Sequence, residues 1–426
     1  MTKNTNLEAI SKYKSLNCSH CGLCLSVCPT YRESLNEMAS PRGRVALAHQ
    51  SLSGELALSP RVFEQMYSCF ACMACRDICP AGVLPDVLAL HLRQVQEELQ
   101  PAGWKNTLFH GLVGRMNRLE LATLPLRLYQ SLGARSLVNT LGMTRLMPKQ
   151  MRDLEAMLPH LPKRPLRKAL PEVTRAYGSE RFRAGFFLGC AQNLMFAVES
   201  AAAVRVMARN GCTVITPKNT VCCGMPADGY GRQDLAQEQA KQNIAAFERA
   251  NVDVIVTDCA TCGSTLKRYE KLLAADPEWA ERASAFQRKV RDISEFLMDL
   301  PLEKPVGRLE LKVTYHDPCH LRRGQGVWEE PRGLLQMIDG LELIEMSEAD
   351  WCCGSAGSQL ITHYDTSLKV LGRKMENVKA ASAQVVASGC PGCQMQLNVG
   401  VRRESLAVKV THPVELLDRA YRVRSS

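Results

Sequence analysis

Short apolar runs alternate with longer amphipathic stretches through the C-terminal half of the chain. The runs GFFLG, TVITP and VDVIVTD have the length and composition of buried strands. Between them lie stretches with helical periodicity, such as LMFAVESAAAVRVMARN and DLAQEQAKQNIAAFERA. The runs LKVTYHDP, LELIEM and AQVVASG follow in the same order further along. Because strand–helix–strand order favours right-handed crossovers, this pattern predicts parallel sheets.

The N-terminal pattern differs, because its apolar residues recur at helical spacing. The segments GRVALAHQSL and SPRVFEQMYSC predict helices, and Ser59-Pro60 is a typical helix start. No apolar run approaches the roughly 20 residues needed to cross a bilayer. The first residues, MTKNTNLEAISKYK, lack the apolar core of a secretory signal. We therefore expect a cytoplasmic protein, whose thiols are kept reduced.

The cysteine content changes this picture, since the 426-residue chain contains 19 cysteines. The length predicts two or three domains. A disulfide framework is not expected, because it belongs to small secreted domains. Eight cysteines fall within residues 18–79 and eleven within 190–393, with none between these ranges. Metal ligation is the leading explanation for such clustering.

The first group of cysteines repeats one motif, Cys-x-x-Cys-x-x-Cys-x-x-x-Cys-Pro. This is the bacterial ferredoxin run for [4Fe–4S] clusters, in which the fourth cysteine ligates the other cluster. Zinc is the alternative, but structural zinc rarely uses three closely spaced thiolates. The motif predicts one cluster on Cys18, Cys21, Cys24 and Cys79, and a second on Cys69, Cys72, Cys75 and Cys28.

The second group of cysteines reveals an internal duplication. Each copy has a single cysteine, then a Cys-Cys-Gly (CCG) motif, then Cys-x-x-Cys, and the two copies are offset by 129 to 131 residues. The alternatives to cluster ligation are packing thiols or a redox disulfide. Cys212 falls outside the repeat, so we expect it in the core. The predicted cofactor ligands are Cys190, Cys222, Cys223, Cys259 and Cys262 in the first copy and Cys319, Cys352, Cys353, Cys390 and Cys393 in the second.

These cysteines follow predicted strands, and open α/β sheets place their ligands at the carboxyl ends of strands. A Cys-x-x-Cys at a strand-to-helix turn has its first thiol near a helix N-terminus, which favours the thiolate. Gly224 and Gly354 would let the backbone approach a metal closely. Among the histidines, His316 is the best candidate for tuning a cluster, because it lies beside Cys319 at a predicted strand end.

Positive charge is concentrated between the two cysteine groups. The formal net charge is +10, and residues 104–170 alone contain 12 Lys/Arg against 3 Asp/Glu. Since the rest of the chain is nearly neutral, a nucleic-acid partner is not expected. The stretch mixes these cations with Leu, Phe, Trp and Met, which is typical of basic amphipathic helices that bind a membrane surface. The alternative is a helical hairpin packed on the N-terminal domain.

These patterns together predict an α+β multidomain protein. We expect a mainly helical two-cluster ferredoxin domain over residues 1–100 and a basic helical connector over 101–178. A duplicated α/β parallel-sheet pair follows, with the first CCG repeat over 179–305 and the second over 306–426. No dinucleotide fingerprint, P-loop or nucleophile elbow is found. Substrate chemistry is therefore expected on another subunit.

Two ferredoxin runs followed by two CCG repeats resemble the iron–sulfur subunit of glycolate oxidase and its D-lactate dehydrogenase relatives. The resemblance rests on CGLCLSVCPTYRESLNEMASPRGRV, FLGCAQ, WCCGSAGSQLITHYD and GRKMEN. It implies an FAD-containing dehydrogenase partner that oxidises a 2-hydroxy acid. It also implies electron transfer to membrane quinone, and a peripheral position on the cytoplasmic face of the inner membrane.

The CCG repeats also resemble those of the CCG-containing subunit of heterodisulfide reductase, in which five cysteines hold a non-cubane [4Fe–4S] cluster. Both repeats here keep all five cysteines. This resemblance implies one or two further iron–sulfur clusters, with the non-cubane form as one alternative. Two other functions therefore compete with the first. One is an electron-transfer subunit of anaerobic glycerol-3-phosphate dehydrogenase, and the other is a heterodisulfide reductase-like catalytic subunit that reduces a disulfide.

Overall fold

The computed structural model describes residues 17–133, 155 and 161–422. Between residues 17 and 99 the regular structure is helical, and the helices α3, α4 and α6 share one apolar core that contains Val45, Val62, Met66 and Leu92. This confirms the predicted helical ferredoxin-like domain. Its elements are η2 (Leu23–Leu25), α2 (Pro29–Ser34), η3 (Glu37–Ala39), α3 (Pro41–Ser53), α4 (Pro60–Tyr67), α5 (Ala74–Asp77) and α6 (Pro85–Leu99).

Serine–proline pairs start two of these helices. The Ser59 hydroxyl accepts a hydrogen bond from the Val62 amide, and Pro60 occupies the first helical position of α4. Ser40 and Pro41 begin α3 in the same way. Such caps satisfy backbone donors that the helix leaves free, and proline loses nothing at a position whose amide has no helical partner. The predicted start at Ser59 is confirmed.

The connector packs on the first repeat. Phe109 is buried with Leu235 and Ala236, and the Phe109 ring lies 5.4 Å from the ring of Tyr230. The connector also contacts the ferredoxin-like domain, because Lys105 forms an ion pair with Glu97 of α6. Residues 134–154 and 156–160 of the connector lie outside the described residues. Its described elements are α7 (Gly103–Lys105), η4 (Asn106–Val113), α8 (Met116–Ala122), α9 (Leu124–Ser131) and α12 (Leu166–Ala169).

The first repeat is a parallel sheet flanked by helices, in the order β3-β2-β4-β5, with the short β1 (Val173–Thr174) added antiparallel beside β3. Its strands are β2 (Phe182–Phe186), β3 (Cys212–Ile215), β4 (Val254–Thr257) and β5 (Val290–Asp292). Its helices are α13 (Cys190–Leu194), α14 (Ala197–Arg209), α15 (Met225–Gly229), α16 (Gln233–Ala250), α17 (Ala260–Leu266), α18 (Tyr269–Leu272), α19 (Ala280–Lys289) and α20 (Ile293–Met298).

The second repeat reproduces this topology, because its sheet has the order β7-β6-β8-β9 and all its pairs are parallel. The predicted duplicated parallel-sheet fold is confirmed. Its strands are β6 (Leu311–Tyr315), β7 (Leu341–Ile344), β8 (Val385–Ala387) and β9 (Lys409–Thr411). Its helices are α21 (Cys319–Gln325), α22 (Glu330–Gln336), α23 (Gln359–Thr362), α24 (Tyr364–Ala380), α25 (Pro391–Arg403) and α26 (Pro413–Arg422).

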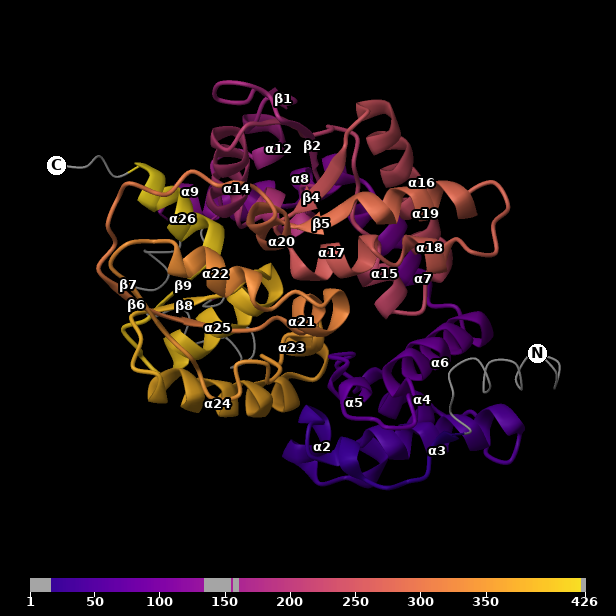
Figure 1. The fold of residues 1–426 in the computed structure, drawn as a ribbon. Helices are drawn as coiled ribbons and strands as arrows, with labels where there is room; N and C mark the ends of the chain where they lie inside the picture. The colour runs from indigo at the N-terminus through magenta and orange to yellow at the C-terminus, as the bar shows by residue number, and fades with distance from the viewer. Residues whose placement is uncertain (1–16, 134–154, 156–160, 423–426) are drawn as a thin grey trace.

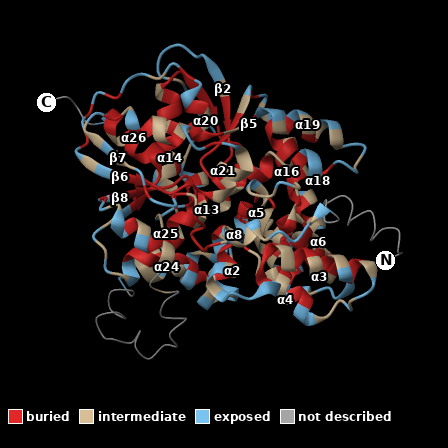
Figure 2. Cartoon of the chain, turned by 60° about the horizontal axis from the view of Figure 1, so that its bottom comes forward, coloured by how far each residue is buried: buried red, intermediate tan, exposed pale blue. Residues whose placement is uncertain are grey.

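The two repeats share one hydrophobic core. Helix α14 of the first packs on α26 of the second, and α20 of the first packs on α22 of the second. Phe186, Val214, Val313 and Leu417 belong to the same buried cluster. Figure 1 shows the repeats side by side, with the helical N-terminal part at the lower edge, and Figure 2 shows buried residues along α14, α20 and α26. This shared core crosses the predicted limit between residues 305 and 306. The domain limits proposed from the sequence therefore stay predictions.

The helices of the described chain are short or amphipathic. Within residues 17–133 and 161–422, none of them combines the length and the apolar character needed to cross a membrane.

Candidate metal centres

The ferredoxin-like domain gathers its eight cysteines around two cavities. The first is lined by all four predicted ligands of one cluster, together with Cys75. The second is lined by Cys28, Cys69, Cys72 and Cys75. In both cases the fourth cysteine of a run lies with the other run, as the crossed assignment requires. The set around the first cavity is Cys18, Cys21, Cys24 and Cys79.

The two runs wrap their thiols with the same backbone conformation. His20 and Gly22 of the first run have positive φ angles, and Ala71 and Met73 occupy the equivalent positions of the second with φ of 48° and 64°. A left-handed conformation costs a residue with a side chain about 1–2 kcal/mol. In the second run both Ala71 and Met73 pay this conformational cost. Strained backbone of this kind is typical of functional sites, and here it turns the neighbouring thiols towards one cavity.

The two cavities differ in depth. Cys21 at the first cavity is exposed, whereas Cys28 and Cys72 at the second are buried. Burial raises the pKa of the Cys24 thiol to about 11 and raises that of Cys75 well above its ordinary value. Because a metal ligand must be the thiolate, cluster binding here must release protons and will be coupled to local folding.

In the first repeat, five thiols form one contiguous group. Hydrogen bonds link Cys190 to Cys222, and hydrogen bonds from Cys222 and Cys262 hold the pKa of the Cys223 thiol well below its ordinary value. Cys259 lies two residues after the end of β4 and caps α17, where its sulfur accepts a hydrogen bond from the Cys262 amide at 3.3 Å. The predicted position of this thiol at a helix N-terminus is thus observed.

The second repeat forms an equivalent group. Cys319 is hydrogen-bonded to Cys352, and the Cys353 and Cys393 sulfurs lie 3.3 Å apart. Hydrogen bonds from Cys352 and Cys393 hold the pKa of Cys353 well below its ordinary value, as in the first repeat. Cys390 caps α25. All ten predicted cysteines therefore fall into two groups of five.

The two groups of five touch each other and the ferredoxin-like domain. The Ala260 amide donates to the Gly389 carbonyl across the repeats at 3.0 Å, and the neighbouring Cys259 thiol holds the pKa of Cys390 well below its ordinary value. The Thr261 hydroxyl lies 3.5 Å from the Cys390 sulfur, a contact that sequence reasoning missed. At the other side, Cys72 packs with Cys352 in one buried cluster, and a hydrogen bond from one thiol to the other raises the pKa of Cys72.

The remaining sequence candidates have clear positions. Cys212 lies in β3 with no exposed surface, as expected for a core residue. His316 is buried, and its ring lies within 4.8 Å of the Cys353 and Cys393 sulfurs. Gly354 has a φ of 88°, and a Cβ there would lie 2.6 Å from the Ser367 carbonyl oxygen. This glycine therefore permits close approach of backbone to backbone, whereas the prediction was an approach to metal.

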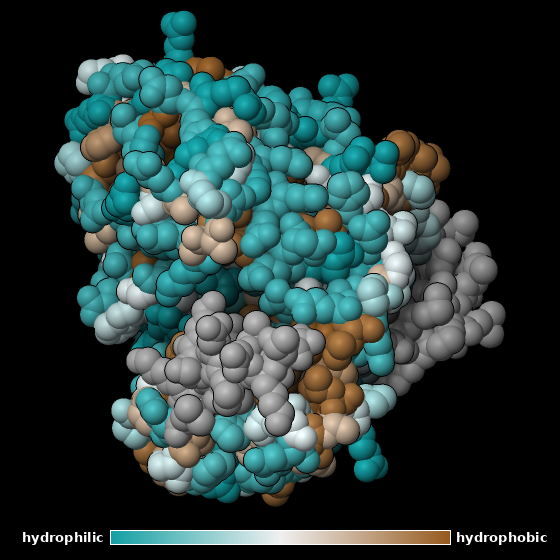
Figure 3. Space-filling model, turned by 90° about the vertical axis from the view of Figure 1, so that its right-hand side faces the viewer, coloured by the Kyte–Doolittle hydropathy of each residue, from teal (hydrophilic) through white to brown (hydrophobic). Residues whose placement is uncertain are grey.

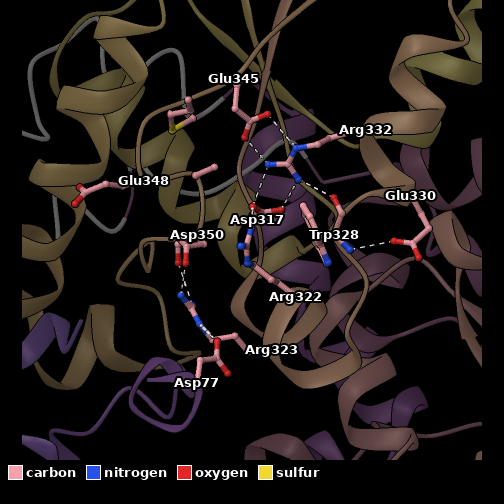
Figure 4. Close-up of polar contacts among 12 residues, drawn as sticks. Asp77, Asp317, Arg322, Arg323, Trp328, Glu330, Arg332, Glu345, Glu348 and Asp350 are labelled. Atoms are coloured by element: carbon pink, nitrogen blue, oxygen red, sulfur yellow. Dashed lines mark hydrogen bonds and ion pairs between the residues drawn. The ribbon is translucent and has the colours of Figure 1, made fainter. Parts of the chain in front are cut away.

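Buried Asp317 fixes the loop between His316 and Cys319. Its carboxylate accepts hydrogen bonds from Arg322 at 2.9 Å and from Arg332 at 2.8 Å, as Figure 4 shows. Arg332 also pairs with Glu345. The helices α21 and α22 and the segment after β7 are thereby joined to the loop that presents Cys319, and charge-assisted bonds of this kind are the stronger class. The role of Asp317 was not predicted, because its arginine partners follow only from the fold.

The donor set fits iron–sulfur clusters. All 19 cysteines are free thiols. Eight line the two cavities of the ferredoxin-like domain and ten form the two CCG groups. Thiolate sets are the ligands that Fe–S clusters use. The ligand assignment of each cysteine stays a prediction.

Three family models match the chain. A 4Fe-4S dicluster domain matches residues 14–83, and the linker region of the glycolate oxidase iron-sulfur subunit matches residues 100–158. The cysteine-rich CCG domain matches twice, over residues 184–267 and 313–398. The matches thus extend over both cysteine groups and the connector between them.

Several relatives match over nearly the whole chain. The probable glycolate oxidase iron-sulfur subunit of Bacillus subtilis (strain 168) is 38% identical, over 97% of this chain and 96% of the relative. The glycolate oxidase iron-sulfur subunit of Escherichia coli (strain K12) is 28% identical, over 97% and 95%. A fumarate reductase (CoM/CoB) subunit of Methanothermobacter marburgensis is 30% identical, over 96% and 73%. A solved structure of a hypothetical protein from Helicobacter pylori has a TM-score of 0.58 at 9% identity, covering 100% of this chain and 74% of that one, which shows likeness of fold alone.

Proposed function

Because the chain belongs to the family of glycolate oxidase iron–sulfur subunits, we propose that it is the electron-transfer subunit of a 2-hydroxy-acid dehydrogenase. Glycolate and D-lactate are the proposed substrates. A separate FAD-containing subunit oxidises the hydroxy acid, and this chain carries the electrons towards membrane quinone.

The continuous series of cysteine groups carries this proposal. Cys75 lines both cavities of the ferredoxin-like domain, Cys72 contacts Cys352, and Cys390 contacts Cys259. Electrons tunnel efficiently only between closely spaced centres. Four clusters held by these cysteines would form one route, in the order first ferredoxin site, second ferredoxin site, second CCG site and first CCG site.

The exposed end of this route suggests where the flavin partner binds. Cys21 is exposed, and Leu23 beside it keeps half of its side-chain surface accessible. The remaining three groups of cysteines are largely buried. We place the flavin partner over the first ferredoxin site, since that site alone combines exposed cysteine with exposed apolar surface.

The connector is the proposed membrane contact. Its helices α8 and α9 expose Leu121, Leu124 and Leu128 beside basic residues that include Arg118 and Arg127. Figure 3 shows a further patch of hydrophobic surface, between the two segments drawn in grey, on the side of the molecule that lies at the right of Figure 1. Apolar residues among cations are typical of segments that lie in the headgroup region of an anionic membrane. Such a position would bring the first repeat, on which the connector packs, towards quinone.

Disulfide reduction at the CCG sites is the second candidate. The observation that favours it is the contact between Cys259 and Cys390, which places the two five-cysteine groups back to back. A pair of clusters in this arrangement could deliver two electrons to one bound disulfide. The glycerol-3-phosphate dehydrogenase alternative shares the architecture and is distinguished by its partner and substrate.

The test uses the native complex, purified anaerobically, with iron and sulfide analysis and electron paramagnetic resonance (EPR). Cys223→Ser and Cys353→Ser should each remove iron from the C-terminal half and abolish glycolate- or D-lactate-dependent reduction of a quinone analogue. The ferredoxin signals should remain. Cys212→Ala is the matched control, because this cysteine is buried outside both groups.

Three outcomes would count against the proposal. Unchanged iron content in both serine variants would exclude cluster ligation by the CCG cysteines. A complex that lacks a flavin partner and reduces a disulfide would favour the second candidate. A complex whose flavin partner oxidises glycerol 3-phosphate, and neither hydroxy acid, would favour the third.

A further inference from the structure

The two CCG groups are not equivalent beyond their cysteines. Three residues before the first cysteine of each repeat, the first repeat has Phe187 and the second has His316. Phe187 is fully buried among Cys222, Cys223 and Phe247 of the first repeat. One face of the first group is therefore apolar, whereas the second group faces an imidazole.

The imidazole of His316 lacks an ordinary partner. Among the described residues, neither of its ring nitrogens has a hydrogen bond, although the side chain is almost fully buried. An imidazole always carries at least one N–H, and leaving a buried donor unsatisfied costs about 1–3 kcal/mol. Its ring lies within 4.8 Å of the Cys353 and Cys393 sulfurs. A cluster bound by these cysteines would offer the acceptor that the histidine lacks.

A second difference lies sixteen residues before each Cys-x-x-Cys motif, where the first repeat has Asn243 and the second has Lys374. The Asn243 side chain accepts from the Val221 amide and donates to the Cys222 carbonyl, so it supports the loop that leads into the CCG motif. Lys374 supports the equivalent loop through the carbonyls of Glu348 and Ala349. The two residues occupy the same place, but only one is a cation.

Lys374 has no exposed surface, and its ammonium group donates to carbonyl oxygens. Among the described residues no carboxylate lies within ion-pair distance of it. A buried charge is costly unless an opposite charge lies nearby. Cluster-bound thiolates of Cys352 and Cys353 would supply that negative charge. Lys374 thus fits an anionic group in the second repeat, and the first repeat has no cation at the same place.

Hydrogen bonds to sulfur and net charge nearby both set the reduction potential of an iron–sulfur cluster. A donor and a cation stabilise the reduced state, because it carries one more negative charge. We propose that His316 and Lys374 give the second CCG cluster a higher reduction potential than the first. This inference rests on the proposed cluster binding, and it is independent of which hydroxy acid is oxidised. Electrons would then collect at the second CCG site, beside the ferredoxin-like domain.

The test is a redox titration of the anaerobically purified full-length protein, followed by EPR at fixed potentials. His316→Phe installs the residue of the first repeat, and Lys374→Gln removes the charge but keeps a donor for the two carbonyls. Each should shift one C-terminal signal to lower potential and leave the ferredoxin signals unchanged. Phe187→His is the reciprocal variant and should shift the other C-terminal signal to higher potential. Iron and sulfide content should equal that of the unmodified protein.

The outcomes separate this inference from the function on which it rests. A C-terminal half that contains no iron or labile sulfide would overturn the cluster assignment itself. Clusters that are present but titrate at one common potential would overturn only this inference. The same conclusion would follow if His316→Phe and Lys374→Gln bound full iron and shifted neither C-terminal signal.

Discussion

Arg323 Nε lies 2.9 Å from Asp77 Oδ2, and the same guanidinium donates to Asp350 at 2.6 Å. Asp77 ends α5 of the ferredoxin-like domain, whereas Arg323 and Asp350 belong to the second repeat (Figure 4). The Arg323 side chain is only 7% exposed. This arginine therefore holds the two halves together close to the contact between Cys72 and Cys352.

Arg323→Ala should weaken this junction and lower the free energy of unfolding by about 1–3 kcal/mol, because it removes charge-assisted bonds from a largely buried group. Thermal unfolding of the apoprotein measures the effect. Arg308→Ala is the control, since its pair with Glu310 is exposed on both sides and should be dispensable. Equal losses in the two variants would contradict the assigned role of Arg323.

Lys105→Met should destabilise the protein by about 3–5 kcal/mol, because it leaves the Glu97 carboxylate buried without its ion-pair partner. Lys105 also donates to the Tyr67 hydroxyl and the Tyr230 carbonyl, so the ferredoxin-like domain, connector and first repeat all meet here. Urea unfolding followed by circular dichroism is the measurement. The double variant Lys105→Met, Glu97→Leu should recover much of the loss. A double variant as unstable as the sum of both singles would argue against a coupled pair.

Gly354→Ala should be clearly more harmful than Gly357→Ala. Both glycines have positive φ angles, but only at Gly354 would a Cβ collide with backbone, at the Ser367 carbonyl. Gly357→Ala should therefore cost only the conformational penalty, about 1–2 kcal/mol. Melting temperature and iron content of the purified protein measure both effects. If the two variants matched in both measurements, the close approach at Gly354 would not matter.

Cys79→Ser should perturb the cluster seeded by Cys18, Cys21 and Cys24, because its sulfur lines their cavity. Cys28→Ser is the reciprocal change and should perturb the cluster of the other run. EPR of the reduced protein separates the two signals. Loss of the signal from the run that contains the substituted residue, in both variants, would reverse the crossed assignment.

The full-length protein should float with anionic liposomes at low salt and release at high salt, because cations of the connector are drawn to the lipid surface. Leu121→Glu and Leu128→Glu should reduce binding, since both side chains are exposed on the connector. Val306→Glu, at an exposed site between the repeats, should not. A holo-complex that stays entirely soluble at low salt would refute the membrane contact.

Cysteine spacing predicted which cysteines lie together, because residues at matching positions of a repeated motif occupy matching places in the fold. The groups around Cys223 and Cys353 follow directly from the duplication. Short strands were harder to predict: β5 and β9 have three residues each, and Val290–Asp292 carries two charged side chains in an otherwise buried strand. Each of these strands forms because it can pair with a neighbouring strand of the sheet, β4 or β8. The hydrophobicity of the short segment itself does not predict such pairing.

Contacts between distant segments could not be predicted from the pattern. The Cys72–Cys352 contact depends on how the ferredoxin-like domain sits on the second repeat. The role of Lys374 was also hidden, because a lysine in the amphipathic segment GRKMEN is normally expected to face solvent. Only the fold shows that this side chain points inward to the loop before the CCG motif.

The reciprocal packing of the repeats has a consequence for their ancestry. Helix α14 of the first repeat is equivalent to α22 of the second, and α20 is equivalent to α26. Because α14 packs on α26 and α22 packs on α20, the two contacts are related as they would be by a two-fold axis. An ancestral chain with one copy would have exposed this apolar face to water, and a second molecule of the same chain could have covered it. Gene fusion would then have turned a homodimer into one polypeptide. In such a fused chain each half is free to diverge, and Phe187 and His316 are one pair of equivalent positions at which the two halves differ.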